Sequence, residues 1–108
     1  MVRDKGLEQL VWDCLGEEAG LSHKSMFGGL AWMHRGNLLC GARTDGLLAR
    51  LGAGNDGWAL AIPGVERMLS GGRPMAGWVR ASADSCDEDL VKRLLDASLA
   101  FVRTLPAK

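Results

Sequence analysis

The chain has 108 residues, of which 47% are hydrophobic and 24% charged, and its formal net charge is zero. This size and composition predict one water-soluble globular domain over residues 1–108 and exclude a disordered or fibrous chain. Because no apolar run reaches the roughly 20 residues of a membrane-spanning helix and no signal-peptide pattern opens the sequence, we expect a cytoplasmic protein without a membrane partner.

The first predicted element is a helix over residues 4–19. Its apolar residues recur at the i, i+3, i+4, i+7 and i+8 positions of one helical face. Asp4 is the expected N-cap and Gly20 the expected end. The stripe consists of Leu7, Leu10, Val11, Cys14 and Leu15.

Alternation with a period of two then predicts three strands, over residues 26–34, 37–44 and 47–51. The dipeptides Arg35-Gly36 and Asp45-Gly46 lie between them. Both are typical of two-residue hairpin turns, because glycine adopts the positive φ that such turns require. These three strands are therefore expected to pair as an antiparallel meander.

The middle of the chain is rich in glycine, and its elements are predicted to be short. Asn55-Asp56 is expected to cap a helix that runs through Ala61 and stops at Pro63-Gly64. A fourth strand over residues 65–69 and a final strand over residues 75–81 follow, with Gly71-Gly72 as the turn between them.

The last predicted element is a helix that starts in a capping box. Ser85 and Glu88 have the spacing at which the two side chains satisfy each other's backbone amides, and Pro106 follows the end. A wide apolar stripe lies between these positions. The order α-β-β-β-α-β-β-α predicts a two-layer α+β fold, an antiparallel sheet with helices packed on it.

The predicted turns fix which face of the sheet each side chain occupies. They place Ala31 opposite Cys40, Met33 opposite Leu38 and Ala42 opposite Ala49, on an apolar face that forms the core. The opposite face is predicted to combine tryptophan with basic residues. Its candidate interface or ligand residues are Trp32, His34, Arg43, Arg50, Trp78 and Arg80.

Three interpretations of this mixed face remain open. Self-association as a homodimer is favoured, because tryptophan and arginine are frequent anchors at protein interfaces. A loop or the short middle helix covering the face is the second interpretation. Binding of nucleic acid or a small anionic ligand, with rings for stacking and arginines for phosphate, is the third, and zero net charge argues against it.

No constellation of residues indicates an enzyme, a cofactor or a metal site. The three cysteines are odd in number and lack a CxxC spacing, and the two histidines lack the spacing of metal ligands. Cys40 is expected to be a small buried hydrophobe. The acidic residues around Glu88 are explained by capping and by the helix dipole. We therefore expect a non-enzymatic protein.

Several segments together resemble a known family. In order they are Met26-Phe27-Gly28-Gly29-Leu30-Ala31, Gly36-Asn37-Leu38, Pro63-Gly64-Val65, Gly72-Arg73-Pro74-Met75-Ala76-Gly77-Trp78-Val79 and Leu99-Ala100-Phe101-Val102-Arg103-Thr104-Leu105-Pro106. The chain resembles the TfoX N-terminal domain family, named after the bacterial competence regulator TfoX (Sxy), over nearly its whole length.

The resemblance implies a small bacterial cytoplasmic α+β domain of the secretion-chaperone type. It implies no catalytic or cofactor residues. In the competence regulators a helical C-terminal domain follows, and the pair acts in transcriptional activation. No such domain is expected here, so the resemblance implies a stand-alone interaction module, accessory to transcriptional regulation, with a transcription-complex protein as a further partner.

Overall fold

The computed structural model describes residues 5–16, 18–26 and 29–107. Its helices are α1 (Lys5–Leu15), α2 (Gly57–Leu60) and α3 (Glu88–Val102), and a 3-10 turn covers Ala83–Ser85. The strands of the described residues are β1 (Leu21–Met26), β2 (Gly29–His34), β3 (Asn37–Arg43), β4 (Gly46–Arg50), β5 (Val65–Ser70) and β6 (Arg73–Ser82).

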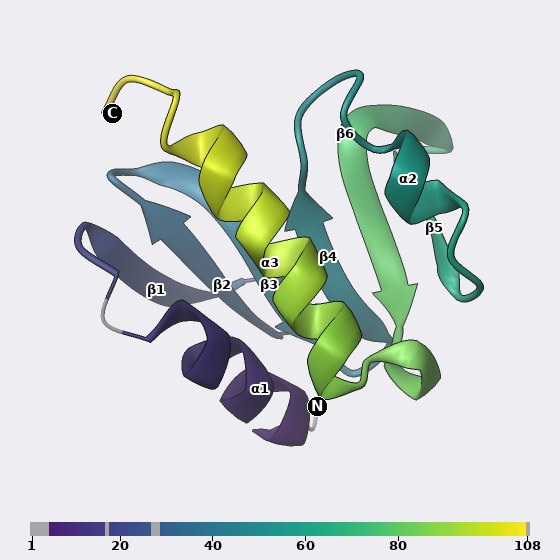
Figure 1. The fold of residues 1–108 in the computed structure, drawn as a ribbon, viewed down its shortest axis with the longest axis horizontal. Helices are drawn as coiled ribbons and strands as arrows, with labels where there is room; N and C mark the ends of the chain where they lie inside the picture. Colours follow the sequence, from purple (N-terminus) through teal and green to yellow (C-terminus); the bar gives the residue numbers. More distant parts are fainter. Residues whose placement is uncertain (1–4, 17, 27–28, 108) are drawn as a thin grey trace.

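The strands form one antiparallel sheet in the order β1-β2-β3-β4-β6-β5. Figure 1 shows the helices on a single side of this sheet, with α3 crossing its middle. The predicted α+β architecture, with helices layered on an antiparallel sheet, is therefore confirmed. The other side of the sheet is not covered by any described helix.

The core lies between the sheet and the helices α1 and α3. Val11 of α1 and Leu94 and Leu95 of α3 are completely buried, as the predicted apolar stripes require. They pack against inward residues of the central strands, such as Leu47 and Val79. Burial of these side chains stabilises the fold by about 1.5–3 kcal/mol for each large residue.

The strand β1 is an element that sequence patterning misses, since the predicted first strand begins only at residue 26. β1 forms one edge of the sheet, and its residues 22–25 are exposed. An edge strand pairs through its backbone on one side only, so it does not need apolar alternation. Phe27 and Gly28, inside the predicted first strand, lie outside the described residues.

The end of α1 and the start of α3 both differ from the prediction. α1 stops at Leu15, and Gly16 follows with a φ of +57°; the predicted cap Asp4 lies outside the described residues. The predicted capping box of α3 is wrong. Asp87 is the N-cap, and its carboxylate accepts a hydrogen bond of 2.8 Å from the Leu90 amide, because Asp87 directly precedes the first helical residue.

The first predicted turn is confirmed and the second is shifted. His34 pairs with Asn37 across Arg35-Gly36. Across the second turn, Arg43 pairs with Gly46, so Thr44 and Asp45 form the turn. Ala42 therefore faces Leu47 rather than Ala49, which corrects the predicted pair. The shift of the turn moves each pairing partner on β4 by two residues. The side chains of β4 therefore stay on the faces predicted for them.

Each described helix is too short or too polar to span a bilayer.

Candidate functional site

Four of the six predicted face residues lie on the side of the sheet that faces away from the helices. We call this surface the open face; it carries Arg43 of β3, Arg50 of β4, and Trp78 and Arg80 of β6. Arg50 pairs with Trp78, and Leu48 pairs with Arg80, across the β4–β6 ladder. All four predicted side chains are partly exposed. The ladders β3–β4 and β4–β6 therefore put the backbone of these four residues on the predicted face, although the Arg50 guanidinium reaches the Phe101 ring of α3.

Trp32 does not belong to the open face, and its predicted placement is wrong. It lies opposite Cys40, is completely buried, and meets the Trp12 ring edge-on with ring centroids 5.4 Å apart. The cause is a bulge in β3. Trp32 pairs with Cys40 but Met33 with Leu38, so Leu39 is an extra residue.

Because of the bulge, the β2 side chains that were predicted for the open face point to the helix side, and those predicted for the core point to the open face. Leu30 and Trp32 consequently enter the core. Ala31 is paired with Gly41 on the open face and not, as predicted, with Cys40. The predicted pair of Met33 with Leu38 is confirmed, because it lies on the turn side of the bulge.

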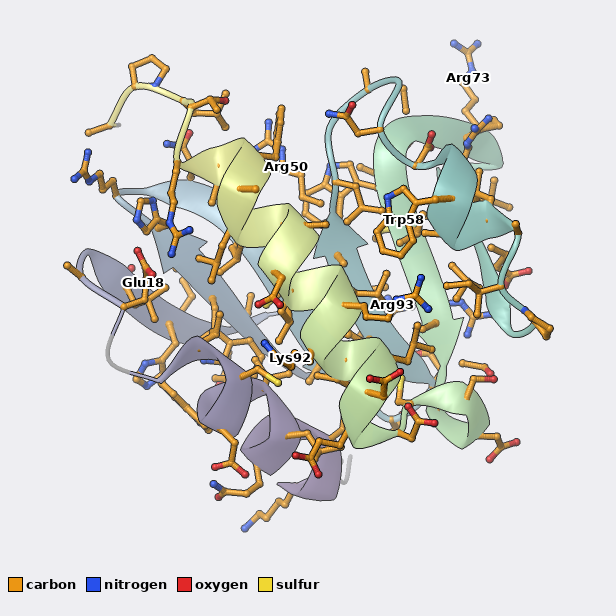
Figure 2. All side chains as sticks on the ribbon, viewed as in Figure 1. Glu18, Arg50, Trp58, Arg73, Lys92 and Arg93 are labelled. Atoms are coloured by element: carbon orange, nitrogen blue, oxygen red, sulfur yellow. The ribbon has the colours of Figure 1, made fainter. Side chains whose placement is uncertain are left out.

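His34 is also wrongly placed by the prediction, for the same reason. It is 3% exposed on the helix side of β2, where its Nε2 atom lies 3.6 Å from Glu18 Oε2. Glu18 in turn accepts hydrogen bonds from the Arg103 guanidinium beyond the end of α3. Figure 2 shows Glu18 near the start of β1, far from Trp58 and Arg93. His34 therefore belongs to a contact between β2, Glu18 and the end of α3, and not to the open face.

We expect Arg103→Gln to lower stability at neutral pH but not in acid. Hydrogen bonds from Arg103 hold the pKa of the Glu18 carboxyl below its ordinary value. A lowered folded-state pKa stabilises the protein above the ordinary glutamate value of about 4.3, and this contribution disappears as the pH falls through the lowered value.

The expected loss at pH 7 is small, because Arg103 is half exposed and water screens its pair with Glu18. Urea unfolding of both proteins between pH 7 and pH 3 measures this, and the two stabilities should converge in acid. Lys92→Gln, which breaks the Lys92–Asp96 pair on α3, is the matched control. A difference that persists unchanged at pH 3 would contradict the assignment.

An apolar hollow of about 280 Å³ lies at the centre of the open face. Ala31, Gly41 and Leu48 form a row across β2, β3 and β4 on which the hollow rests. Trp78 and Arg43 also line it. The remaining wall comes from the hairpin of β5 and β6, through Met68, Leu69 and Met75.

The β5–β6 hairpin reaches this hollow because β6 bends at Gly77. In a flat sheet, β6 would lie three strand spacings of about 4.8 Å from β2, too far away for its residues to line the same hollow as Ala31. Arg67 pairs with Val79 but Leu69 with Pro74, so residues 75–78 oppose Met68 alone. Gly77 has a φ of +81°, and its carbonyl accepts a hydrogen bond of 2.6 Å from Leu51. This irregularity curves the hairpin over the open face.

Sequence reasoning selected Arg43 and Trp78 but missed the wall of the hollow that the β5–β6 hairpin provides. Leu69 is 59% exposed, although the predicted strand contains it as an ordinary apolar residue. Gly41 interrupts an apolar strand without any turn signal around it. A glycine inside a strand is typical of a bulge or a close approach, and it was the available signal for this site.

Two of the three arginines on the open face are paired with carboxylates. Arg43 donates to Asp45 at 3.0 and 2.9 Å. Arg80 pairs with Glu66 and lies 3.6 Å from Asp45. These pairs leave the border of the hollow with two positive and two negative side chains.

Arg50 is held differently from the other two arginines. Its guanidinium lies 6.0 Å from the Trp78 ring centre and 5.4 Å from that of Phe101, and it donates to the Leu38 carbonyl at 3.4 Å. Figure 2 shows it near the carboxyl end of α3. Within the described ranges no carboxylate lies at ion-pair distance from Arg50.

Metal binding and nucleophilic attack are two further kinds of chemistry to consider for the described residues. None of them form a group of three or more His, Cys, Asp or Glu side chains that could hold a metal. Cys40 is buried in the core, and this burial raises the pKa of its thiol far above the usual range. Such a thiol stays protonated and is a poor nucleophile.

Comparison of the chain with family models, curated proteins and solved structures finds no match. The site is therefore interpreted from its own geometry.

Proposed function

We propose that this protein is a non-enzymatic interaction module of the TfoX N-terminal type that forms a homodimer through its open face. We propose further that it works in the bacterial cytoplasm as an accessory to transcriptional regulation, with a transcription-complex protein as a second partner. The TfoX-like segments support the family and the pathway. The apolar hollow, bordered by Trp78 and by exposed Leu69, is the observation that supports the interface.

The alternative, binding of nucleic acid or a small anion through the same face, is less well supported. Affinity for nucleic acid depends mainly on basic side chains that are free to neutralise phosphates. Arg43 and Arg80 are already neutralised by Asp45 and Glu66. Arg50 beside Trp78 is the feature that keeps this alternative testable.

Analytical ultracentrifugation of the wild type and two tryptophan variants tests the dimer. We expect twice the chain mass for the wild type and the monomer mass for Trp78→Glu, because a carboxylate would have to be buried in the contact. Trp58→Glu is the matched control, since Trp58 is 39% exposed on the helix side and should leave the mass unchanged. A wild type that stays monomeric at its solubility limit would overturn the dimer.

Fluorescence anisotropy of labelled DNA across a salt series tests the alternative. We expect no salt-dependent binding at low ionic strength. Binding that weakens steeply with salt and is lost in Arg50→Gln would instead favour the nucleic-acid function.

A further inference from the structure

We infer that in the homodimer the Leu69 side chain of each copy enters the hollow above Gly41 of the other copy. This inference rests on the proposed dimer and specifies its central contact. Each chain carries both parts of this contact on its open face: Leu69, which protrudes, and the hollow, which receives the Leu69 of the other chain.

Gly41 forms part of the floor of the hollow, and the backbone does not require glycine there. Gly41 lies in the middle of β3 without the positive φ that favours glycine. A Cβ atom at this position would lie 3.5 Å from the Leu30 carbonyl oxygen and 3.8 Å from Leu48 Cδ1, which are ordinary contacts. Glycine inside a strand costs conformational entropy on folding. A side chain can therefore start at this position without a backbone clash.

The protruding residue is Leu69. Of the described residues, the large hydrophobic side chains classed as exposed are Leu69 at 59% and Trp58 at 39%. Trp58 is on the helix side, where the Arg93 guanidinium lies 5.3 Å from its ring centre. Leu69 lies on the edge strand β5, directly at the border of the hollow.

The charges at this border fit a second copy of the chain. Arg43 and Arg80 are balanced by Asp45 and Glu66. Arg50 beside Trp78 adds a positive charge without a carboxylate at ion-pair distance among the described residues. A two-fold contact presents the same surface twice, so the partly exposed Asp45 and Glu66 of one copy can face Arg50 of the other. The hollow, at about 280 Å³, lies at the lower limit of the roughly 300–1,000 Å³ of small-molecule sites. It is therefore large enough to receive a leucine side chain.

Two variants that remove opposite halves of the contact test the inference. Gly41→Leu places a side chain on the floor of the hollow and keeps Leu69, while Leu69→Ala removes the inserted side chain and leaves the floor at Gly41 open. We expect each variant alone to dimerise at least about tenfold more weakly than the wild type, measured by sedimentation equilibrium.

The mixture of the two variants is the decisive measurement. In the mixed dimer, Leu69 of the Gly41→Leu chain meets an open hollow, and the hollow of the Gly41→Leu chain meets the small side chain of the Leu69→Ala chain. One full contact is restored without a clash. We therefore expect the mixture to form heterodimers more tightly than either variant forms homodimers, as detected with two fluorophores by energy transfer.

The outcomes separate this inference from the proposed function. A monomeric wild type would overturn both. If the wild type is a dimer and neither variant weakens it, the inference is wrong, and the protein dimerises through another part of its surface. Weak homodimers without complementation in the mixture would also overturn it. Urea unfolding is the folding control: both variants should keep a cooperative transition, with the midpoint of Gly41→Leu equal to or above that of the wild type.

Discussion

Gly77→Ala is expected to destabilise the protein by about 2–4 kcal/mol. Two penalties combine at this position. The φ of +81° strains any residue with a Cβ atom. In addition, the Cβ atom would lie 2.4 Å from the Gly52 carbonyl carbon and 2.5 Å from the Ala53 amide nitrogen, and these backbone atoms cannot move without breaking the β4–β6 junction. Because domains of this size are stable by about 5–15 kcal/mol, the loss is large.

Gly54→Ala is the matched control for Gly77→Ala. Gly54 has nearly the same φ, +84°, but no atom lies within 4 Å of the position that a Cβ would occupy. Only the conformational penalty of about 1 kcal/mol applies there. Urea unfolding followed by circular dichroism measures both variants. Equal losses would show that β6 does not approach residues 52–53 as closely as described.

Trp32→Ala is expected to cost about 3–5 kcal/mol, because it removes the largest fully buried side chain among the described residues. The cavity would open between the sheet and α1, where Trp12 packs against Trp32. Neighbouring core residues on β3 and α3 are fixed by their own elements and can fill it only in part.

Trp58→Ala is the comparison for Trp32→Ala, since it changes the same residue type at a 39% exposed position. It removes the ring beside Arg93 and should cost no more than about 1 kcal/mol. Unfolding in urea, followed by far-ultraviolet circular dichroism, measures the two losses. Similar losses for both variants would contradict burial of Trp32 and support its predicted place on the open face.

The local signals in the sequence were sufficient for the positions of the long helices and for four of the six predicted face residues. The stripe of α3 and the alternation of β4 and β6 are regular, so Arg50, Trp78 and Arg80 lie on the face predicted for them. The Arg35-Gly36 turn is confirmed because glycine supplies the required φ, +84° at Gly36. Each of these features depends on residues that are close together in the chain.

The bulge at Leu39 shows why the faces of Trp32 and His34 were not predictable. One unpaired residue in β3 exchanges the two faces of β2, and nothing in the apolar run around Leu39 marks it. Trp32 and His34 were therefore assigned to the wrong side. The hollow depends on contacts between strands that are distant in sequence, from Ala31 of β2 to Met75 of β6. Turn chemistry and periodicity do not encode such contacts.

The position of β6 between β4 and β5 has a consequence for biosynthesis. A growing chain can form the β1–β4 meander early, but β4 keeps an unpaired edge until residues 73–82 have emerged. The helix α1 precedes the meander and can cover part of its apolar side, but the rest stays uncovered until α3 follows. Partly exposed sheets of this kind are prone to aggregate. On the ribosome, the nascent protein therefore depends on the prompt arrival of its last third.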